Sequence, residues 1–279
     1  MMNLNAVSET ALITLKARVI EAEKPVPLIH DPRGREVMDR LGSLVSAGTQ
    51  QRVLEKKLKP ALISYLALRA RKYDAYTHAF LEEHPGGRVV SLGSGFDTRY
   101  WRISDKPWDY TEVDLPEVIA IKKEVLGKDP GYEMIGCSVL HDDWIEQVSG
   151  RQKQNVLILA EGLLMYLREA DAIGLIKKLA MTFSESQLVF EIIHRKYTKG
   201  FRKRLVESKI KGASGTMAGE SYRFGLIDAR DIENYAENIR VVDEWSYFED
   251  PDLKPRFLRI LRHFRSFART QWTIRALIK

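Results

Sequence analysis

From Arg88 onward, short apolar segments alternate with helical ones, and this alternation limits the possible folds more than any other feature of the chain. Five of these segments are typical of buried strands: RVVSLG, WDYTEVDLP, YEMIGCSV, NVLILAEG and QLVFEIIH. Between them, Pro116–Leu126 and Arg168–Met181 have the apolar spacing of helices. Strands that alternate with helices form crossover units and a parallel sheet covered on both faces. We therefore predict an α/β fold, with NIRVVDEW and QWTIRALIK as two further strands.

The first 85 residues differ from the rest because their apolar spacing is mostly helical. Thr10–Glu21 and Glu55–Glu83 both place apolar residues at helical intervals. A His-Pro-Gly-Gly stretch then ends the helical region. We therefore expect a helical N-terminal cap over residues 1–85, followed by one α/β domain over residues 86–279.

One internal segment, Tyr197–Tyr222, is polar and rich in glycine and lysine. It follows the fifth predicted strand, so we expect an inserted helical lid over about residues 197–222, close to the strand ends. Together with the N-terminal helices, such a lid would cover a bound ligand and exclude water from it.

The composition excludes several classes of protein. No apolar stretch approaches the roughly 20 residues of a membrane-spanning helix, and the first residues lack the pattern of a secretory signal. We therefore expect no membrane partner and a cytoplasmic location. The single cysteine, Cys137, leaves no internal disulfide and no cysteine-based zinc site, so we expect no metal.

The net charge of +6 is mildly basic, and much of the excess lies in Lys254–Arg275. A phosphate-binding stripe is one interpretation of this segment. We favour a solvated helix face, because apolar residues recur at helical spacing among the charges: Phe257, Leu258, Leu261 and Phe264. We therefore expect no nucleic-acid partner.

The turn after the first predicted strand carries the clearest sign of chemistry. Glycines at Gly93 and Gly95 let the backbone bend sharply and let a ligand approach without a Cβ in the way. A dinucleotide site would have a third glycine where this chain has Thr98, preceded by Asp97. A carboxylate at the start of the helix disfavours a pyrophosphate and suits a cationic ligand. The turn therefore favours a cationic ligand over a dinucleotide.

Two acidic residues stand at the ends of predicted strands. Asp114 closes the second strand, at about the 20-residue interval at which a βαβ unit places an acid for the ribose hydroxyls. Glu161 stands where the most apolar strand ends, and ligands of open α/β sheets lie outside the carboxyl ends of strands. We expect Glu161 to face a cationic ligand group, with a salt bridge to a helix as the alternative.

Three motifs together resemble the leucine carboxyl methyltransferase family of S-adenosylmethionine-dependent O-methyltransferases, most closely the tetracenomycin-type polyketide O-methyltransferases. The motifs are Leu92-Gly93-Ser94-Gly95-Phe96-Asp97-Thr98-Arg99, Glu112-Val113-Asp114-Leu115-Pro116 and Glu161-Gly162-Leu163-Leu164-Met165-Tyr166-Leu167. The resemblance extends from about Thr10 through the last predicted strand. It implies a class I methyltransferase-like Rossmann sheet of seven strands, with S-adenosylmethionine as the cofactor. The last strand would be antiparallel, which the short connection through residues 254–265 also favours.

The same resemblance implies roles for individual residues. Arg69 would bind the carboxylate of the cofactor, and Asp114 would hold its ribose. Gly93 and Gly95 would line the approach, and Glu161 would lie against the cofactor on the floor of the site. The chemistry agrees, because an arginine suits a carboxylate, an aspartate suits a diol and acidic surroundings suit a sulfonium.

The adenine contact departs from the family pattern. The family usually has an Asp-Leu pair after the third strand, and the corresponding residues here are Ser138 and Val139. Serine can accept the hydrogen bond from the adenine amino group as a neutral side chain. Asp142 is the alternative if the correspondence is shifted.

The resemblance implies that the acceptor is a carboxylate or a phenol hydroxyl of a small organic molecule. A carboxylate is ionised at pH 7, whereas a phenol, with a pKa of about 10, would benefit from a base. Tyr166 and His194 are candidates for a catalytic role, although ordinary packing explains each equally well. Four basic residues offer positive charge to an anionic acceptor: Lys16, Arg18, Arg195 and Lys196.

Two alternatives stay open at this point. The acceptor could be the C-terminal carboxylate of a protein rather than a small acidic or phenolic molecule. The enzyme could also be a nicotinamide-dependent oxidoreductase, since the same βαβ unit serves both cofactors, although the missing third glycine argues against it. The sequence does not determine the oligomeric state.

Overall fold

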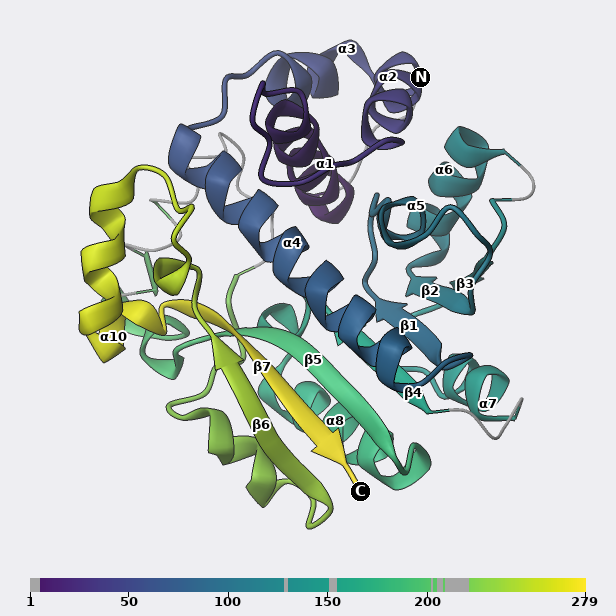
Figure 1. The fold of residues 1–279 in the computed structure, drawn as a ribbon, viewed down its shortest axis with the longest axis vertical. Coiled ribbons are helices and arrows are strands. Elements are labelled where there is room, and N and C mark those ends of the chain that lie inside the picture. The colour runs from purple at the N-terminus through teal and green to yellow at the C-terminus, as the bar shows by residue number, and fades with distance from the viewer. Residues whose placement is uncertain (1–5, 128–129, 151–154, 202, 205–207, 209–220) are drawn as a thin grey trace.

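The computed structural model describes residues 6–127, 130–150, 155–201, 203–204, 208 and 221–279 (Figure 1). Its strands are β1 (Arg88–Leu92), β2 (Tyr110–Asp114), β3 (Glu133–Gly136), β4 (Val156–Ala160), β5 (Ser186–Ile193), β6 (Ile239–Trp245) and β7 (Gln271–Ile278). Its α-helices are α1 (Ala6–Ala22), α2 (Gly34–Leu44), α3 (Ala47–Thr49), α4 (Pro60–Glu83), α5 (Arg99–Ile103), α6 (Pro116–Leu126), α7 (Asp143–Ser149), α8 (Glu169–Thr182) and α10 (Arg265–Ala268). Shorter turns are the π-helix η1 (Gln50–Leu54) and the 3₁₀-helices η2 (Leu164–Tyr166), η3 (Arg195–Tyr197), η4 (Ala229–Asn234), η5 (Tyr247–Glu249) and η6 (Arg256–His263).

The described strands form one seven-stranded sheet in the order β3-β2-β1-β4-β5-β7-β6. Strands β1 to β5 are parallel, and β7 pairs antiparallel with both β5 and β6. The predicted seven strands and the antiparallel last strand are therefore confirmed. The strand order reverses between β1 and β4, and open α/β sheets bind ligands at such a point, outside the carboxyl ends of the strands.

Strands β1, β2, β4 and β5 are buried along their whole length, which requires apolar cover on both faces. Helix α4 crosses one face of the sheet and α8 lies on the other (Figure 1). Successive side chains of a strand point to opposite faces. Val89 of β1 accordingly packs in one cluster with Tyr73 of α4, whereas Val90 packs in another with Leu175 of α8. These two clusters fix the sheet between its helices.

The N-terminal helices pack around a core of their own, which includes Leu12 and Leu15 of α1 and Leu41 of α2. Phe96, from the glycine turn after β1, belongs to the same core and joins it to the sheet. Helix α4 begins at Pro60, later than the predicted start at Glu55, because proline is favoured in the first turn of a helix and lacks the N–H that a helix interior needs. The division of the chain at residue 85 stays a prediction.

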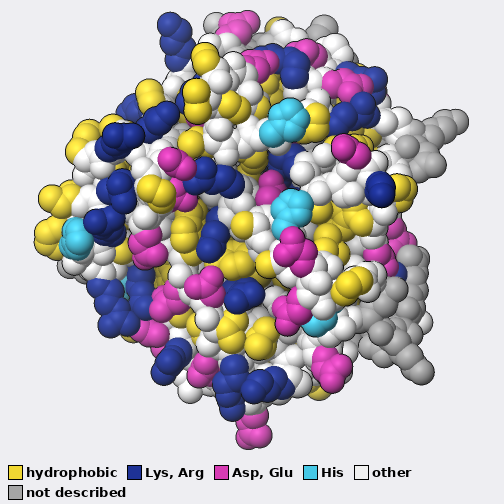
Figure 2. Space-filling view, in the orientation of Figure 1, with side chains coloured by type: hydrophobic (Ala, Val, Ile, Leu, Met, Phe, Trp, Pro, Cys, Tyr) yellow, Lys and Arg dark blue, Asp and Glu magenta, His cyan; other side chains and the backbone are white. Residues whose placement is uncertain are grey.

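The basic C-terminal segment differs in part from its predicted form. Residues 256–263 form the 3₁₀-helix η6, which repeats every three residues rather than every 3.6. Leu258 and Leu261 pack against a buried cluster, as an apolar face would. Phe257 and Phe264 are instead 72% and 54% exposed. Figure 2 shows hydrophobic and basic side chains intermixed along this edge of the molecule.

Two further expectations concern the lid and the absence of a membrane-spanning helix. The predicted lid over residues 197–222 lies largely outside them, with η3 on one side and Tyr222 on the other. Among the helices that the structure describes, none is both long enough and apolar enough to cross a membrane.

Candidate active site

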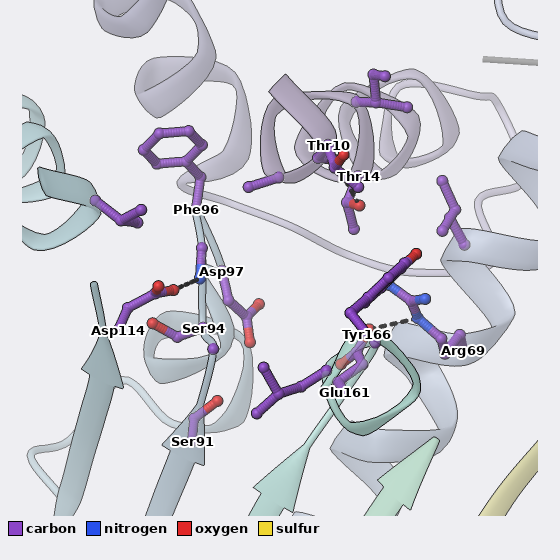
Figure 3. Close-up of a pocket in the computed structure, with 18 of the residues that line it drawn as sticks. Thr10, Thr14, Arg69, Ser91, Ser94, Phe96, Asp97, Asp114, Glu161 and Tyr166 are labelled. Atoms are coloured by element: carbon purple, nitrogen blue, oxygen red, sulfur yellow. Dashed lines mark hydrogen bonds and ion pairs between the residues drawn. The ribbon is translucent and has the colours of Figure 1, made fainter. Parts of the chain in front are cut away.

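A cavity with a volume of about 380 Å³ lies at the carboxyl ends of β1 and β4, under helices α1 and α4. All seven residues predicted for cofactor binding line it: Arg69, Gly93, Gly95, Asp114, Ser138, Val139 and Glu161. Figure 3 shows Asp114 and Ser94 on one side, Arg69, Glu161 and Tyr166 on the other, and Thr10 and Thr14 of α1 above. Residues predicted from five separate stretches of sequence therefore meet in one place.

The glycine turn after β1 is in close contact with α1 and with the loop after β4. Gly93 and Gly95 have φ values of +63° and +52°, in the left-handed region that favours glycine. A Cβ on Gly95 would lie 2.7 Å from the Cβ of Ala11, and a Cβ on Gly93 would lie 3.0 Å from Leu163 Cδ1. The absence of these Cβ atoms therefore lets helix α1 and the loop after β4 close onto the turn.

Gly95→Ala should disturb both the fold and the site. The substitution places a side chain at positive φ and against α1, so we expect the free energy of unfolding to fall by about 1–3 kcal/mol. The change should be measured by urea unfolding. Gly174→Ala in α8 is the matched control, because its added Cβ meets nothing within 4 Å, and it should be neutral or slightly stabilising. Equal effects of the two substitutions would contradict the role of the close contact with α1.

Asp114 is held by the backbone around it. Its Oδ2 accepts a hydrogen bond from Gly95 N at 2.6 Å, and its Oδ1 accepts one from Leu115 N at 2.7 Å. Burial raises the pKa of Asp114, and these two backbone donors oppose the rise. Beside it, Ser94 Oγ is buried and has no hydrogen-bond partner in the part of the chain that the structure describes. This corner can therefore accept further hydrogen bonds from a diol.

Glu161 is bound by two arginines from different helices. Arg69 Nε of α4 donates to Glu161 Oε1 at 2.8 Å, and Arg99 Nη2 of α5 donates to Glu161 Oε2 at 2.7 Å. Burial alone would raise the pKa of Glu161, but the two guanidiniums outweigh it and hold the pKa below its usual range. The alternative of a salt bridge to a helix is therefore present, and the same ionised carboxylate also lines the cavity.

Asp97, the acid of the glycine turn, is an ionised side chain surrounded by arginines. It lies within 2.7 Å of Arg99 Nη1 and 2.9 Å of Arg102 Nη1, and Arg18 Nη2 is 3.8 Å away. Burial opposes its ionisation, yet the three guanidiniums bring the pKa of Asp97 well below its ordinary value. Asp97 Oδ1 also accepts hydrogen bonds from Thr98 N and Arg99 N, so this carboxylate fixes the start of α5, and it lines the cavity as well.

Two predicted positions lie outside the cavity. His194 is not among the lining residues, and its Nδ1 accepts a hydrogen bond from Lys196 N at 3.2 Å, as the cap of η3. Asp142 pairs with Lys178 at the surface and is also absent from the lining. Tyr166 lines the cavity, as do Ser138 and Val139. Of the positions considered for the adenine contact, Ser138 and Val139 therefore line the cavity and Asp142 does not.

The four basic residues expected to attract an anionic acceptor all have partners within the protein, and of the four only Arg18 lines the cavity. Lys16 Nζ donates to the carbonyls of Val53, Leu54 and Lys56 at the end of η1, and burial lowers its pKa. Arg18 donates to Asp31 and to the carbonyl of Phe96. Arg195 pairs with Glu169, and Lys196 donates to the carbonyl of Ser266.

Sequence reasoning missed four residues that form the other end of the site. Tyr65, Tyr222 and Gln271 line the cavity, and Glu191 of β5 lies directly behind Tyr65. Tyr222 stacks on Tyr166 with ring centroids 5.4 Å apart. The sequence did contain one indication of Glu191, because it is the only acid in the predicted strand QLVFEIIH and has apolar residues on both sides.

Comparison with known proteins gives the family. Residues 11–180 match the family model described as leucine carboxyl methyltransferase. The chain is 30% identical over 252 residues to the tetracenomycin polyketide synthesis O-methyltransferase of Streptomyces glaucescens, covering 90% of this chain and 86% of that protein. It is 28% identical over 198 residues to the S-adenosyl-L-methionine-dependent methyltransferase dpfgK of Gibberella zeae, covering 68% of this chain and 65% of that protein.

A solved structure supports the fold. A duf574 family protein from Streptomyces avermitilis superposes with a TM-score of 0.55 and 13% identity, covering 95% of this chain and 97% of that chain. The seven-stranded sheet with its antiparallel β7 is, as predicted, that of a class I methyltransferase. The cofactor of this protein is S-adenosylmethionine, and no comparison supports the alternative of a nicotinamide-dependent oxidoreductase. The chain therefore belongs to the leucine carboxyl methyltransferase family, as an S-adenosylmethionine-dependent methyltransferase.

Proposed function

We propose that this enzyme methylates an oxygen of a small organic acceptor, either a carboxylate or a phenol hydroxyl. The side chains that line the cavity are the observation that supports this proposal most directly. The same cavity that holds the polar corner around Gly93 and Asp114 is lined by apolar and aromatic side chains from α1, α4, the loop after β4 and the segment before η4: Ile13, Leu62, Tyr65, Leu66, Tyr166 and Tyr222. Such a chamber suits a compact, largely apolar molecule with few polar groups. The Streptomyces glaucescens relative, a polyketide O-methyltransferase, supports the same class of acceptor.

The residues present fit the proposed cofactor roles. Asp114 would accept hydrogen bonds from both ribose hydroxyls, and the unpartnered Ser94 Oγ beside it would gain a partner. Arg69 donates from Nε and Nη1 to two glutamates, Glu161 and Glu191, and from Nη1 to the Tyr65 oxygen. A guanidinium has five N–H donors, so donors remain for the carboxylate of the methionine part. Ser138 and Val139 would contact the adenine, Ser138 as a neutral acceptor. The ionised Glu161 would lie close to the sulfonium.

The protein's part in methyl transfer is alignment. When bound, S-adenosylmethionine supplies a methyl group on a positively charged sulfur that leaves as a neutral thioether. The chamber would hold the acceptor oxygen in line with that methyl group, and α1 over the glycine turn would keep water out.

Helix α1 should respond to cofactor binding, because it both lines the cavity and presses on the glycine turn. We expect amide hydrogen exchange of residues 12–19 to slow when S-adenosylhomocysteine is added, since a ligand at 100 times its Kd stabilises the bound state by about 2.7 kcal/mol. Peptides from the middle of α8, which does not line the cavity, are the internal reference. Identical exchange of residues 12–19 with and without ligand would show that α1 takes no part in binding.

An acceptor screen tests the proposed function. The purified enzyme and S-adenosylmethionine should be offered small phenols, small carboxylic acids, folded proteins and peptides with a free C-terminal leucine, with methylated products identified by mass spectrometry. We expect methyl esters or ethers of small molecules. Methylation of proteins or peptides alone would replace this proposal with the protein C-terminal carboxyl methyltransferase alternative.

A further inference from the structure

The 3₁₀-helix η6 sorts its side chains into three rows, because residues three apart lie one above the other in such a helix. Leu258 and Leu261 form one row, which packs inward against a cluster that includes Leu68 of α4. The other two rows are not buried: Arg256, Arg259 and Arg262 in one, and Phe257, Ile260 and His263 in the other. Packing within the fold therefore accounts for one row and leaves two rows facing outward.

The outward apolar row is extended by α10, which packs against η6. Phe264 and Phe267 lie edge to face, with ring centroids 6.4 Å apart. Together with Phe257 and Ile260, they form an apolar surface whose four side chains are 51–72% exposed. Apolar side chains scattered singly on a surface are ordinary, but four on two adjoining helices indicate an interaction site. Because each is more than half exposed, the apolar surface protrudes and is not a groove.

The charges beside the apolar surface are of one sign. Residues 254–270 contain six Lys or Arg residues and no Asp or Glu. Two of these arginines, Arg265 and Arg269, are compensated because they pair with Asp228. In the part of the chain that the structure describes, no carboxylate pairs with the three arginines of η6. The partner that fits this surface is therefore anionic as well as apolar.

The apolar surface lies at the same edge of the sheet as the cavity. Helix α10 ends at Ala268, and β7 begins shortly afterwards at Gln271, which lines the cavity. Gln271 is paired with Ile193 at the carboxyl end of β5. Figure 1 accordingly shows α10 beyond the end of β7 that is opposite the C-terminus. A partner seated on the apolar surface would lie beside the edge of the sheet that holds the active site.

We propose that the apolar surface and the three arginines of η6 dock the enzyme on an anionic lipid surface. Because the apolar and cationic rows are adjacent on one short helix, the partner must present apolar groups and anions close together. A bilayer does so along its whole interface, where acyl chains lie directly beneath headgroup phosphates and carboxylates that guanidinium groups bind well.

This docking is compatible with the absence of a spanning segment. The expectation of no membrane partner came from that absence, and a helix that lies on a bilayer needs no such length. The protruding phenylalanines would enter the boundary between headgroups and acyl chains, and the arginines would stay at the level of the phosphates. The proposal does not depend on the identity of the methyl acceptor.

Vesicle binding tests the proposal with the full-length enzyme. The probes are vesicles of equal parts phosphatidylserine and phosphatidylcholine, and vesicles of phosphatidylcholine alone, with bound protein measured by sedimentation. We expect binding to the phosphatidylserine vesicles and little to the others, and weaker binding as salt is added. Replacing Arg256, Arg259 and Arg262 by glutamine should weaken binding about 100-fold, at about fivefold for each arginine near an anionic surface.

The apolar part of the surface has its own variant. Phe257→Ser with Ile260→Ser should weaken binding by about tenfold or more, since it removes the side chains that enter the lipid. The matched control for the arginines replaces the exposed Lys57, Lys59 and Lys177 by glutamine, which changes the net charge equally, and the control for the apolar pair is Val26→Ser with Met181→Ser. Both controls should bind vesicles within about twofold of wild type. All variants should keep the wild-type Kd for S-adenosylhomocysteine, which shows that they are folded.

Three results would overturn the proposal. The first is a wild-type enzyme that does not sediment with phosphatidylserine vesicles. The second is an equal loss of binding in the lysine control and the arginine variant, which would reduce the effect to net charge. The third is wild-type dimerisation without vesicle binding, abolished by Phe257→Ser with Ile260→Ser, which would assign the apolar surface to a second copy of this chain.

Discussion

Arg99→Met is expected to lower the free energy of unfolding by about 3–5 kcal/mol, the usual cost of removing one partner from a buried ion pair. Arg99 is 1% exposed and contacts the carboxylates of Asp74, Asp97 and Glu161 at 2.7–2.8 Å. Methionine fills similar space but leaves those carboxylates less compensated. Urea unfolding followed by circular dichroism measures the change.

The control for Arg99→Met is Arg168→Met, which removes an exposed arginine paired with Asp171. Exposed pairs contribute little, so we expect no resolvable change in the unfolding midpoint. Similar midpoints for the two variants would show that the buried network around Arg99 does not stabilise the fold.

The same substitution should shift acid unfolding. The folded-state pKa of Asp97 lies well below its unfolded value of about 3.9, so its contribution to stability is present above that value and is lost as the pH falls through the folded pKa. Without Arg99 the pKa of Asp97 is depressed less. Acid unfolding of Arg99→Met should therefore begin at a higher pH than that of wild type.

Asp114→Ala is expected to weaken cofactor binding by about 1–3 kcal/mol, the scale for leaving buried polar partners unpaired. This corresponds to a rise in the Kd of S-adenosylhomocysteine of roughly 5- to 150-fold, measured by calorimetry. Asp109→Ala is the matched control, because Asp109 precedes the other end of β2 and pairs with Arg88 away from the cavity. Unchanged affinity in folded Asp114→Ala would reduce Asp114 to a structural ligand of Gly95 N and Leu115 N.

The sequence by itself determined the sheet and one half of the site. The patterns that predicted them are local: apolar strand segments, glycines at the first turn and acids at strand ends can each be recognised within a few residues. These patterns predicted that Gly93, Asp114 and Glu161 belong to one site, and all three line the same cavity. Parallel crossover connections bring the carboxyl ends of strands to the same edge, so strand order alone placed these residues together.

Only the tertiary structure decided how the charges are used. Asp97, Lys16 and Arg18 looked available in the sequence, but each is bound by partners that the folded chain supplies. Tyr65 and Glu191 are 126 residues apart and meet because α4 crosses the face of the sheet beside β5. An ion pair or a pKa depends on what surrounds a group in space, and spacing along the chain does not carry that information when the partners come from distant elements.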